Sequence, residues 1–240
     1  MADPRPTARA AGREDRLRFL MFRAWARASE RFLAIRVKVE GTPPEGPCLL
    51  VTNHLSYLDI ALLARRHDAT FVSMAEVAGW PGMGKIAKEL GTIFVDRERR
   101  KDAARAAEQI QERLARGETV VLFPEGRAGD GRQINPFHSP LLEPAAKLGL
   151  PVRWAALGYF TPPGQPCASA VVCWTESVSF GEHLYRLMRL PRIDARIAYG
   201  DAPIQDGDRK RLAKRLEEAV RSRFRPVPGA PAPAPELARV

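Results

Sequence analysis

Short apolar runs alternate with helical patterns along most of the chain, and this alternation is the feature that most constrains its fold. The run Thr119–Phe123 is almost wholly apolar, which is typical of a strand buried on both faces of a sheet. Cys48–Val51 and Thr92–Val95 are further short apolar runs, and helical patterns follow them. The alternation predicts an α/β fold, with a mixed, mostly parallel sheet flanked by helices. Ala168–Trp174 is expected to form another strand, and His67 to lie at the surface.

Polar residues follow three of these apolar runs at equivalent points. They are His54, Arg97 and Glu125. In sheets of this kind, functional groups gather in the crevice at the carboxyl ends of the strands. Three polar residues so placed indicate a functional site more strongly than any one of them alone.

The spacing of His54 and Asp59 is informative. On one continuous helix, residues five apart point about 140° from each other and could not touch. A turn between a strand and a helix would bring them together, so that a carboxylate orients an imidazole and the imidazole takes a proton from a hydroxyl. In an alternative interpretation, Ser56 and Asp59 serve the N-terminus of a helix and His54 is an ordinary loop residue. These residues alone leave both interpretations open.

Composition limits the partners and the redox setting. The 240 residues suit one domain with tails, and the net charge of +10 favours a polyanionic partner such as nucleic acid, an anionic membrane or anionic substrates. The arginines are not interleaved with aromatic residues in a nucleic-acid-binding pattern, so we expect no nucleic-acid partner. Three cysteines without metal-ligand spacing predict a reducing environment and no metal site. No apolar run approaches the roughly 18 residues that span a bilayer.

The two ends of the chain differ in pattern from its centre. Residues 1–12 are expected to be disordered, as is the Pro/Ala-rich tail 225–240. Residues 13–34 predict a basic amphipathic helix, which either lies in a membrane interface or packs its apolar stripe on the protein core. The stripe consists of Leu17, Leu20, Met21, Ala24, Trp25, Ala28 and Phe32, and Arg16, Arg23, Arg27 and Arg31 fall mostly outside it.

Several motifs, in order, resemble those of a known family. Asn53–Asp59 (NHLSYLD), Gly91–Arg97 (GTIFVDR) and Phe123–Gly126 (FPEG) resemble the first three blocks of the glycerophospholipid acyltransferases of the lysophosphatidic acid type, and Leu150–Val152 resembles the fourth. The resemblance extends from about Ile35 to Phe224. Four further stretches are similar to the bacterial branch that includes ornithine-lipid O-acyltransferases: Glu76–Gly84, Asp130–Phe137, Phe180–Leu184 and Ile197–Ile204.

The resemblance implies a glycerolipid acyltransferase-like domain over residues 35–224 and a specific chemistry. The enzyme would move a fatty acyl group from acyl-CoA or acyl carrier protein to the free hydroxyl of a lysolipid, either lysophosphatidic acid or lyso-ornithine lipid, without a further cofactor. His54 would be the general base and Asp59 would orient it. Arg97 would hold the anionic head group, and Glu125 and Gly126 would position the acceptor.

The sequence departs from the family pattern in two places. The third block usually continues with Gly-Thr and often Arg, but here Arg127 follows Gly126 directly, so we place Arg127 among the substrate-binding residues. Many relatives carry an apolar N-terminal membrane helix, whereas residues 13–34 are Arg-rich, which predicts peripheral binding at the cytoplasmic face of the membrane. The alternative function is a non-catalytic membrane- or lipid-binding protein of the same fold.

Overall fold

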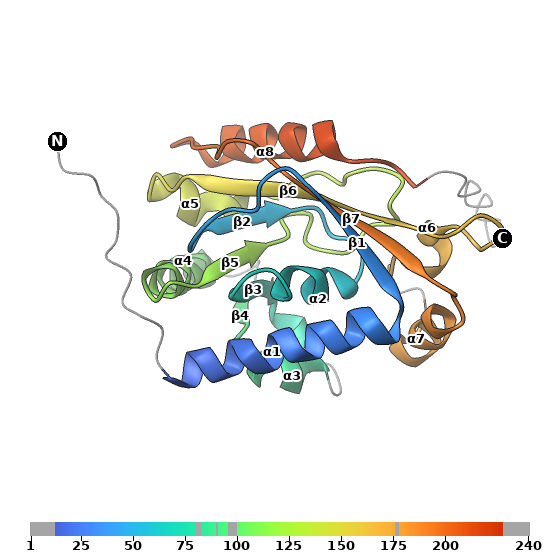
Figure 1. The fold of residues 1–240 in the computed structure, drawn as a ribbon. Helices are drawn as coiled ribbons and strands as arrows, with labels where there is room; N and C mark the ends of the chain where they lie inside the picture. The colour runs from blue at the N-terminus through green and yellow to red at the C-terminus, as the bar shows by residue number, and fades with distance from the viewer. Residues whose placement is uncertain (1–12, 80–82, 90, 96–99, 176–177, 228–240) are drawn as a thin grey trace, which may run out of the picture.

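One seven-stranded sheet organises the protein (Figure 1). The computed structural model describes residues 13–79, 83–89, 91–95, 100–175 and 178–227. The strand order is β1-β7-β6-β2-β5-β3-β4, and every pair is parallel except β6 with β7. The strands are β1 (Ile35–Glu40), β2 (Leu49–Thr52), β3 (Ala69–Met74), β4 (Ile93–Val95), β5 (Thr119–Leu122), β6 (Val152–Phe160) and β7 (Ile193–Tyr199). The predicted mixed, mostly parallel sheet is confirmed.

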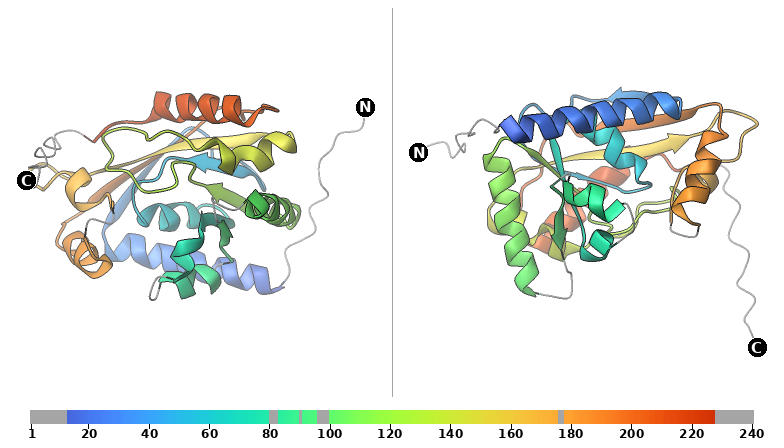
Figure 2. Two further views of the ribbon diagram at one scale, coloured as in Figure 1. Left: turned by 180° about the vertical axis from the view of Figure 1, so that it is seen from behind. Right: turned by 90° about the horizontal axis from the view of Figure 1, so that it is seen from below.

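Helices cover both faces of the sheet (Figure 2). The helices are α1 (Arg13–Phe32), α2 (Leu58–Ala64), η1 (Ala75–Gly79), α3 (Met83–Glu89), α4 (Arg100–Ala115), η2 (Ser139–Leu142), α5 (Glu143–Lys147), α6 (Ala168–Val171), α7 (Phe180–Met188) and α8 (Arg209–Arg223). Helices α1, α2 and α7 share one apolar core, and α4, α5 and α8 share the other. Leu50 of β2 enters the first core, while its neighbours Leu49 and Val51 enter the second. This alternation explains why the central strands are apolar on both faces.

Two predictions from the sequence are wrong. Ala168–Val171 forms the short helix α6, not a strand, because β2 and β7 already occupy both edges of β6 and no edge there is open for another strand. His67 is buried, and its Nε2 lies 2.8 Å from the hydroxyl of Tyr199. Burial lowers the pKa of His67 to about 4, so the ring is neutral near pH 7.

Helix α1 carries two apolar faces. The face that packs on the core is not the stripe predicted from the periodicity. Phe19, Phe22, Ala26 and Leu33 are buried. The predicted stripe faces outward instead, with exposed fractions of 58% for Leu17, 64% for Leu20 and Met21, 46% for Trp25 and 68% for Phe32. The interpretation in which this stripe packs on the core is therefore wrong.

Ion pairs connect α1 to the rest of the domain. Arg18 lies 3.0 Å from the buried carboxylate of Glu118, and Arg23 lies 2.7 Å from Asp68. Helix α1 is thus an integral part of the domain that presents an apolar surface. Residues 1–12 and 228–240, for which disorder is predicted, lie outside the described residues.

Candidate active site

The site begins at a turn that leaves the carboxyl end of β2. Asn53 fixes this turn to β6, because its side-chain amide donates to the carbonyl of Leu157 (3.1 Å) and its side-chain oxygen accepts from the Leu157 N–H (2.7 Å). His54 follows, and α2 begins at Leu58 with Asp59 in its first turn. The chain therefore reverses direction between His54 and Asp59.

The turn brings His54 and Asp59 into contact. Their Nδ1 and Oδ2 atoms are 2.7 Å apart, and Asp59 is fully buried. Asp59 Oδ2 also accepts hydrogen bonds from the backbone N–H groups of Leu55 (2.7 Å) and Ser56 (3.1 Å). The contact predicted by the first interpretation is present, and the same carboxylate also orders the backbone at the start of α2. The alternative is correct for Asp59 only, because the Ser56 side chain does not cap α2 and His54 is paired. With Nδ1–H donating to Asp59, Nε2 carries the lone pair that can take a proton.

Tyr159 completes the environment of Asp59. Its hydroxyl donates to Asp59 Oδ1 over 2.7 Å, and the whole side chain is buried in β6. Burial and the adjacent carboxylate raise the pKa of Tyr159 well above its usual range, so the phenol stays protonated and keeps donating. Sequence reasoning missed this residue, because Tyr159 stands 100 positions from its partner and belongs to no recognised block.

Glu125 holds the backbone on the other side of His54. Its Oε1 accepts from the His54 N–H (2.7 Å), and its Oε2 accepts from the Asn135 N–H (2.8 Å). The carbonyl of His54 in turn accepts from the N–H of Gly129 (2.8 Å). Burial raises the pKa of Glu125 to about 7, and the two backbone hydrogen bonds limit this rise. These contacts favour a role in positioning the His54 turn.

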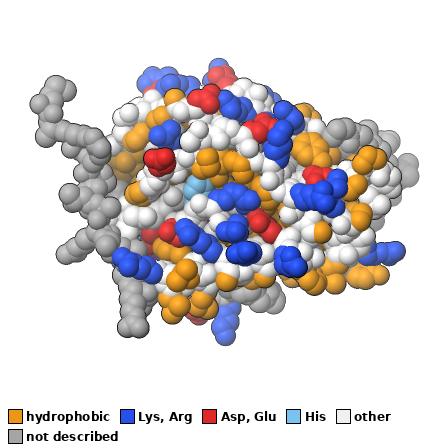
Figure 3. Space-filling view, viewed as in Figure 1, with side chains coloured by type: hydrophobic (Ala, Val, Ile, Leu, Met, Phe, Trp, Pro, Cys, Tyr) orange, Lys and Arg blue, Asp and Glu red, His pale blue; other side chains and the backbone are white. Residues whose placement is uncertain are grey.

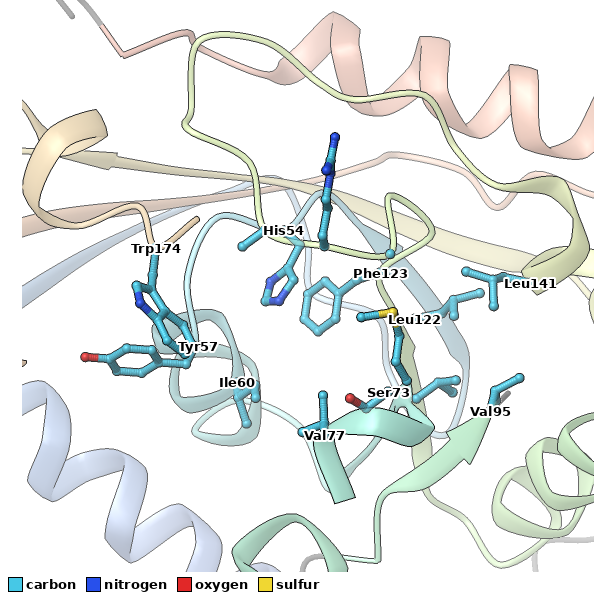
Figure 4. A pocket seen from close by; sticks show the side chains of 15 residues that line it. His54, Tyr57, Ile60, Ser73, Val77, Val95, Leu122, Phe123, Leu141 and Trp174 are labelled. Atoms are coloured by element: carbon cyan, nitrogen blue, oxygen red, sulfur yellow. The ribbon is translucent and has the colours of Figure 1, made fainter. Parts of the chain in front are cut away.

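A cavity of about 120 Å³ lies in front of His54 (Figure 4). The imidazole stacks on Phe123 with ring centroids 4.2 Å apart, and Tyr57 and Trp174 line the same end of the cavity. Gly126 and Arg127, two of the predicted acceptor-binding residues, also line it. The remaining wall is mostly apolar and includes Ile60, Val72, Met74, Val77, Val95 and Leu122. The cavity therefore combines a basic group, a cation and a mostly apolar wall.

Other predicted groups stand as follows. Arg97 lies outside the described residues, so its role as a head-group ligand stays a prediction. Among the residues that the structure describes, no three side chains of His, Cys, Asp or Glu come together as metal ligands would. No helix in the described part of the chain combines the length and apolarity needed to cross a membrane.

Comparison with known proteins identifies the class. Residues 34–155 match the model of the family described as Acyltransferase. The lyso-ornithine lipid O-acyltransferase of Pseudomonas aeruginosa is 34% identical over 206 residues, which cover 85% of this chain and 78% of that protein. The 1-acyl-sn-glycerol-3-phosphate acyltransferase of Neisseria meningitidis serogroup B is 30% identical over 195 residues, covering 79% of this chain and 75% of that protein.

A solved structure shows the same fold. The 1-acyl-sn-glycerophosphate acyltransferase PlsC of Thermotoga maritima superimposes with a TM-score of 0.59 at 20% identity, over 87% of this chain and 80% of that one. The family match spans β1 to β5 and the turn that carries His54, and the sequence matches together define the protein as an acyltransferase enzyme. The chain belongs to the Acyltransferase family.

Proposed function

We propose that the protein transfers a fatty acyl group from a thioester donor, acyl-CoA or acyl carrier protein, to the free hydroxyl of a lysolipid. The observation that carries this proposal is the 2.7 Å contact between His54 Nδ1 and the buried Asp59 at the edge of an apolar cavity. A base fixed in one tautomer beside an apolar surface suits the deprotonation of a hydroxyl on an amphiphilic molecule.

In the proposed reaction, Nε2 of His54 takes the proton of the acceptor hydroxyl as its oxygen attacks the thioester carbonyl. A carbon–oxygen bond forms, the carbon–sulfur bond then breaks, and the leaving thiolate takes the proton back from the imidazolium. Asp59 stabilises the imidazolium between these two steps, because its buried carboxylate lies against Nδ1. No acyl group is attached to the enzyme at any stage.

The cavity divides the substrates into apolar and anionic parts. The wall that includes Val72, Val95 and Leu122 suits the fatty acyl chain. Arg127 suits an anionic group of the acceptor, and Arg97 is proposed to assist it, since a guanidinium binds carboxylate and phosphate equally well. Relatives named for lyso-ornithine lipid support a carboxylate-bearing acceptor, and those named for 1-acyl-sn-glycerol-3-phosphate support a phosphate-bearing one. We favour lyso-ornithine lipid, because four further stretches of the chain are similar to the branch that includes the ornithine-lipid O-acyltransferases.

The acceptor resides in a bilayer, and we propose that α1 holds the enzyme at the cytoplasmic face. Its outward stripe contains Trp25 and Phe32. The exposed residues Arg16, Arg27 and Arg31 follow one flank of that stripe by helix geometry. A helix with aromatic residues on one side and arginines beside them binds an anionic interface reversibly.

The test is acyl transfer by the parent protein and His54→Ala with both lysolipids and both donors. We expect the substitution to lower the rate about 10²–10⁴-fold, because that is the usual contribution of a positioned base. The readouts are thiol release and mass spectrometry of the lipid product. A parent protein that binds lysolipid vesicles but releases no thiol would support the non-catalytic alternative, and a His54→Ala protein as fast as the parent would exclude the mechanism.

A further inference from the structure

Helix α7 carries a second outward apolar face. Tyr185 and Met188 are exposed by 58% and 52%, while His183 and Leu187 are buried. Tyr185 and Met188 are three residues apart and point away from His183, so they lie next to each other on the outward side of the helix. Phe180 is exposed by 40% at the start of α7 and points about 20° from Leu187, toward the side that packs on the domain.

Helix α7 packs on the same face of the sheet as α1 (Figure 2). In the view from below, α1 and α7 both lie toward the viewer, together with α3 (right view of Figure 2). Hydrophobic side chains gather along the lower edge of the space-filling view, where these two helices lie (Figure 3).

Helix α7 also adjoins one end of the cavity. The ring of Phe180 lies 5.0 Å from the ring of Tyr57 and 6.3 Å from that of Trp174. Both of these residues line the cavity (Figure 4). His183 also contacts Tyr57, since its Nδ1 is 3.1 Å from the Tyr57 hydroxyl. Ring contacts thus join the start of α7 to the aromatic end of the cavity in front of His54.

The charges near these faces fit an anionic surface. On α7, Glu182 is already paired with Arg186 at 2.5 Å, which leaves the exposed Arg189 beside the Tyr185 ring at 5.7 Å. On α1, Arg16 and Arg27 are exposed and form no ion pair with any residue in the part of the chain that the structure describes. Apolar and aromatic side chains bordered by unneutralised arginines complement the head groups and the acyl boundary of an anionic bilayer.

We infer that α7 is a second membrane contact, which together with α1 places the Tyr57–Trp174 end of the cavity at the surface of an anionic bilayer. The inference rests on the proposed function, because it gives the membrane-dissolved acceptor its route to His54. A protein that contacts a bilayer through one helix can still rotate about the axis of that helix. A second contact beside the cavity removes this freedom and orients the entrance.

The test compares the parent with Tyr185→Ser/Met188→Ser and with Leu148→Ser. Leu148 is an exposed apolar residue at the end of α5, in the layer on the other face of the sheet, and is the matched control. All three proteins are incubated with vesicles of phosphatidylcholine alone and with vesicles of equal parts phosphatidylcholine and phosphatidylglycerol. Binding is measured by co-sedimentation, and turnover is measured with a long-chain lysolipid in the vesicles and with a short-chain lysolipid dissolved as monomers.

For the α7 variant we expect binding to the anionic vesicles to fall about tenfold, because two side chains lose their apolar burial. Turnover of the vesicle-bound acceptor should fall with it, while turnover of the dissolved acceptor should equal that of the parent. Leu148→Ser should match the parent in every measurement. High salt should weaken binding of the parent to the anionic vesicles.

The outcomes separate the inference from the proposed function. Equal vesicle binding and turnover by the α7 variant and the parent would overturn the inference, while turnover of the dissolved acceptor would still support the function. A parent that turns over neither acceptor would overturn the function, and co-sedimentation would still report on α7. A parent that is dimeric by gel filtration, beside a monomeric α7 variant, would assign this face to a subunit interface and overturn the inference.

Discussion

Asp59 and Glu125 are both buried carboxylates in contact with His54, but they hold different parts of that residue. Asp59 contacts the imidazole and accepts further hydrogen bonds from two backbone N–H groups and from Tyr159. Glu125 accepts hydrogen bonds from the backbone N–H groups of His54 and Asn135. One carboxylate thus acts on the ring that carries the proton, and the other fixes the position of the chain that carries the ring. The role of a carboxylate close to a histidine is therefore inferred from the atom it contacts, since proximity alone would make these two equivalent.

Asp59→Asn gives the largest effect and tests the first half of the comparison. The neutral amide nearly preserves the shape of the side chain but cannot balance the charge of an imidazolium. We expect kcat to fall about 10²–10⁴-fold, close to the loss for His54→Ala. Steady-state kinetics with saturating donor and acceptor measures this. A variant with the parent kcat would show that Asp59 serves only to order the start of α2.

The second prediction concerns Glu125 and the pH dependence of stability. Burial raises its pKa from 4.5 to about 7 in the folded protein, so the folded state retains a proton between these pH values that the unfolded chain has lost. The contribution of Glu125 to the free energy of unfolding is therefore complete below pH 4.5 and disappears as the pH rises to about 7. The difference between these two pKa values corresponds to about 3 kcal/mol in the free energy of unfolding.

Urea unfolding of the parent and of Glu125→Gln across this pH range isolates that contribution, because the buried His67 titrates in both proteins alike. We expect the difference in free energy of unfolding, parent minus variant, to decrease as the pH rises and to level off above pH 7. A constant difference would mean that Glu125 has the same charge in the folded and unfolded states, and the contrast with Asp59 would then rest on geometry alone.

Tyr159→Phe is expected to lower kcat least, and it tests the hydrogen bond from Tyr159 to Asp59. It removes one hydrogen bond to a buried carboxylate and leaves the shape of the core almost unchanged. We expect kcat to fall about tenfold, with the KM values for donor and acceptor near those of the parent. Tyr199→Phe is the matched control, because Tyr199 is also a buried tyrosine with a histidine-bound hydroxyl but lies away from Asp59. Equal losses of kcat in both variants would indicate a general effect of core hydroxyls.

Much of the site was predictable from the sequence because its central contact is local. His54 and Asp59 share one turn, so the strand end before them and the helical pattern after them suffice to bring the two side chains together. The α/β architecture was predictable for a similar reason, since apolar runs and helical periods are properties of short windows. The role of Glu125 was less accessible: the family resemblance pointed to the acceptor, whereas the carboxylate contacts the backbone of a residue 71 positions away.

The tertiary structure determined the contacts between residues that are far apart in the sequence. Tyr159 and Asn53 act across 100 and 104 positions, through the pairing of β2 with β6.

Helices α1 and α8 show the same limit of prediction from the sequence. Both helices are amphipathic and rich in arginine, but the structure treats their apolar faces differently. Helix α8 buries Leu212, Leu216 and Val220 in the core, and Arg209, Arg211 and Arg221 are paired with carboxylates, whereas α1 leaves Leu20 and Trp25 exposed. The sequence determines that a helix has an apolar face, but the elements packed around the helix determine whether that face is covered, because burial depends on neighbours that are distant along the chain.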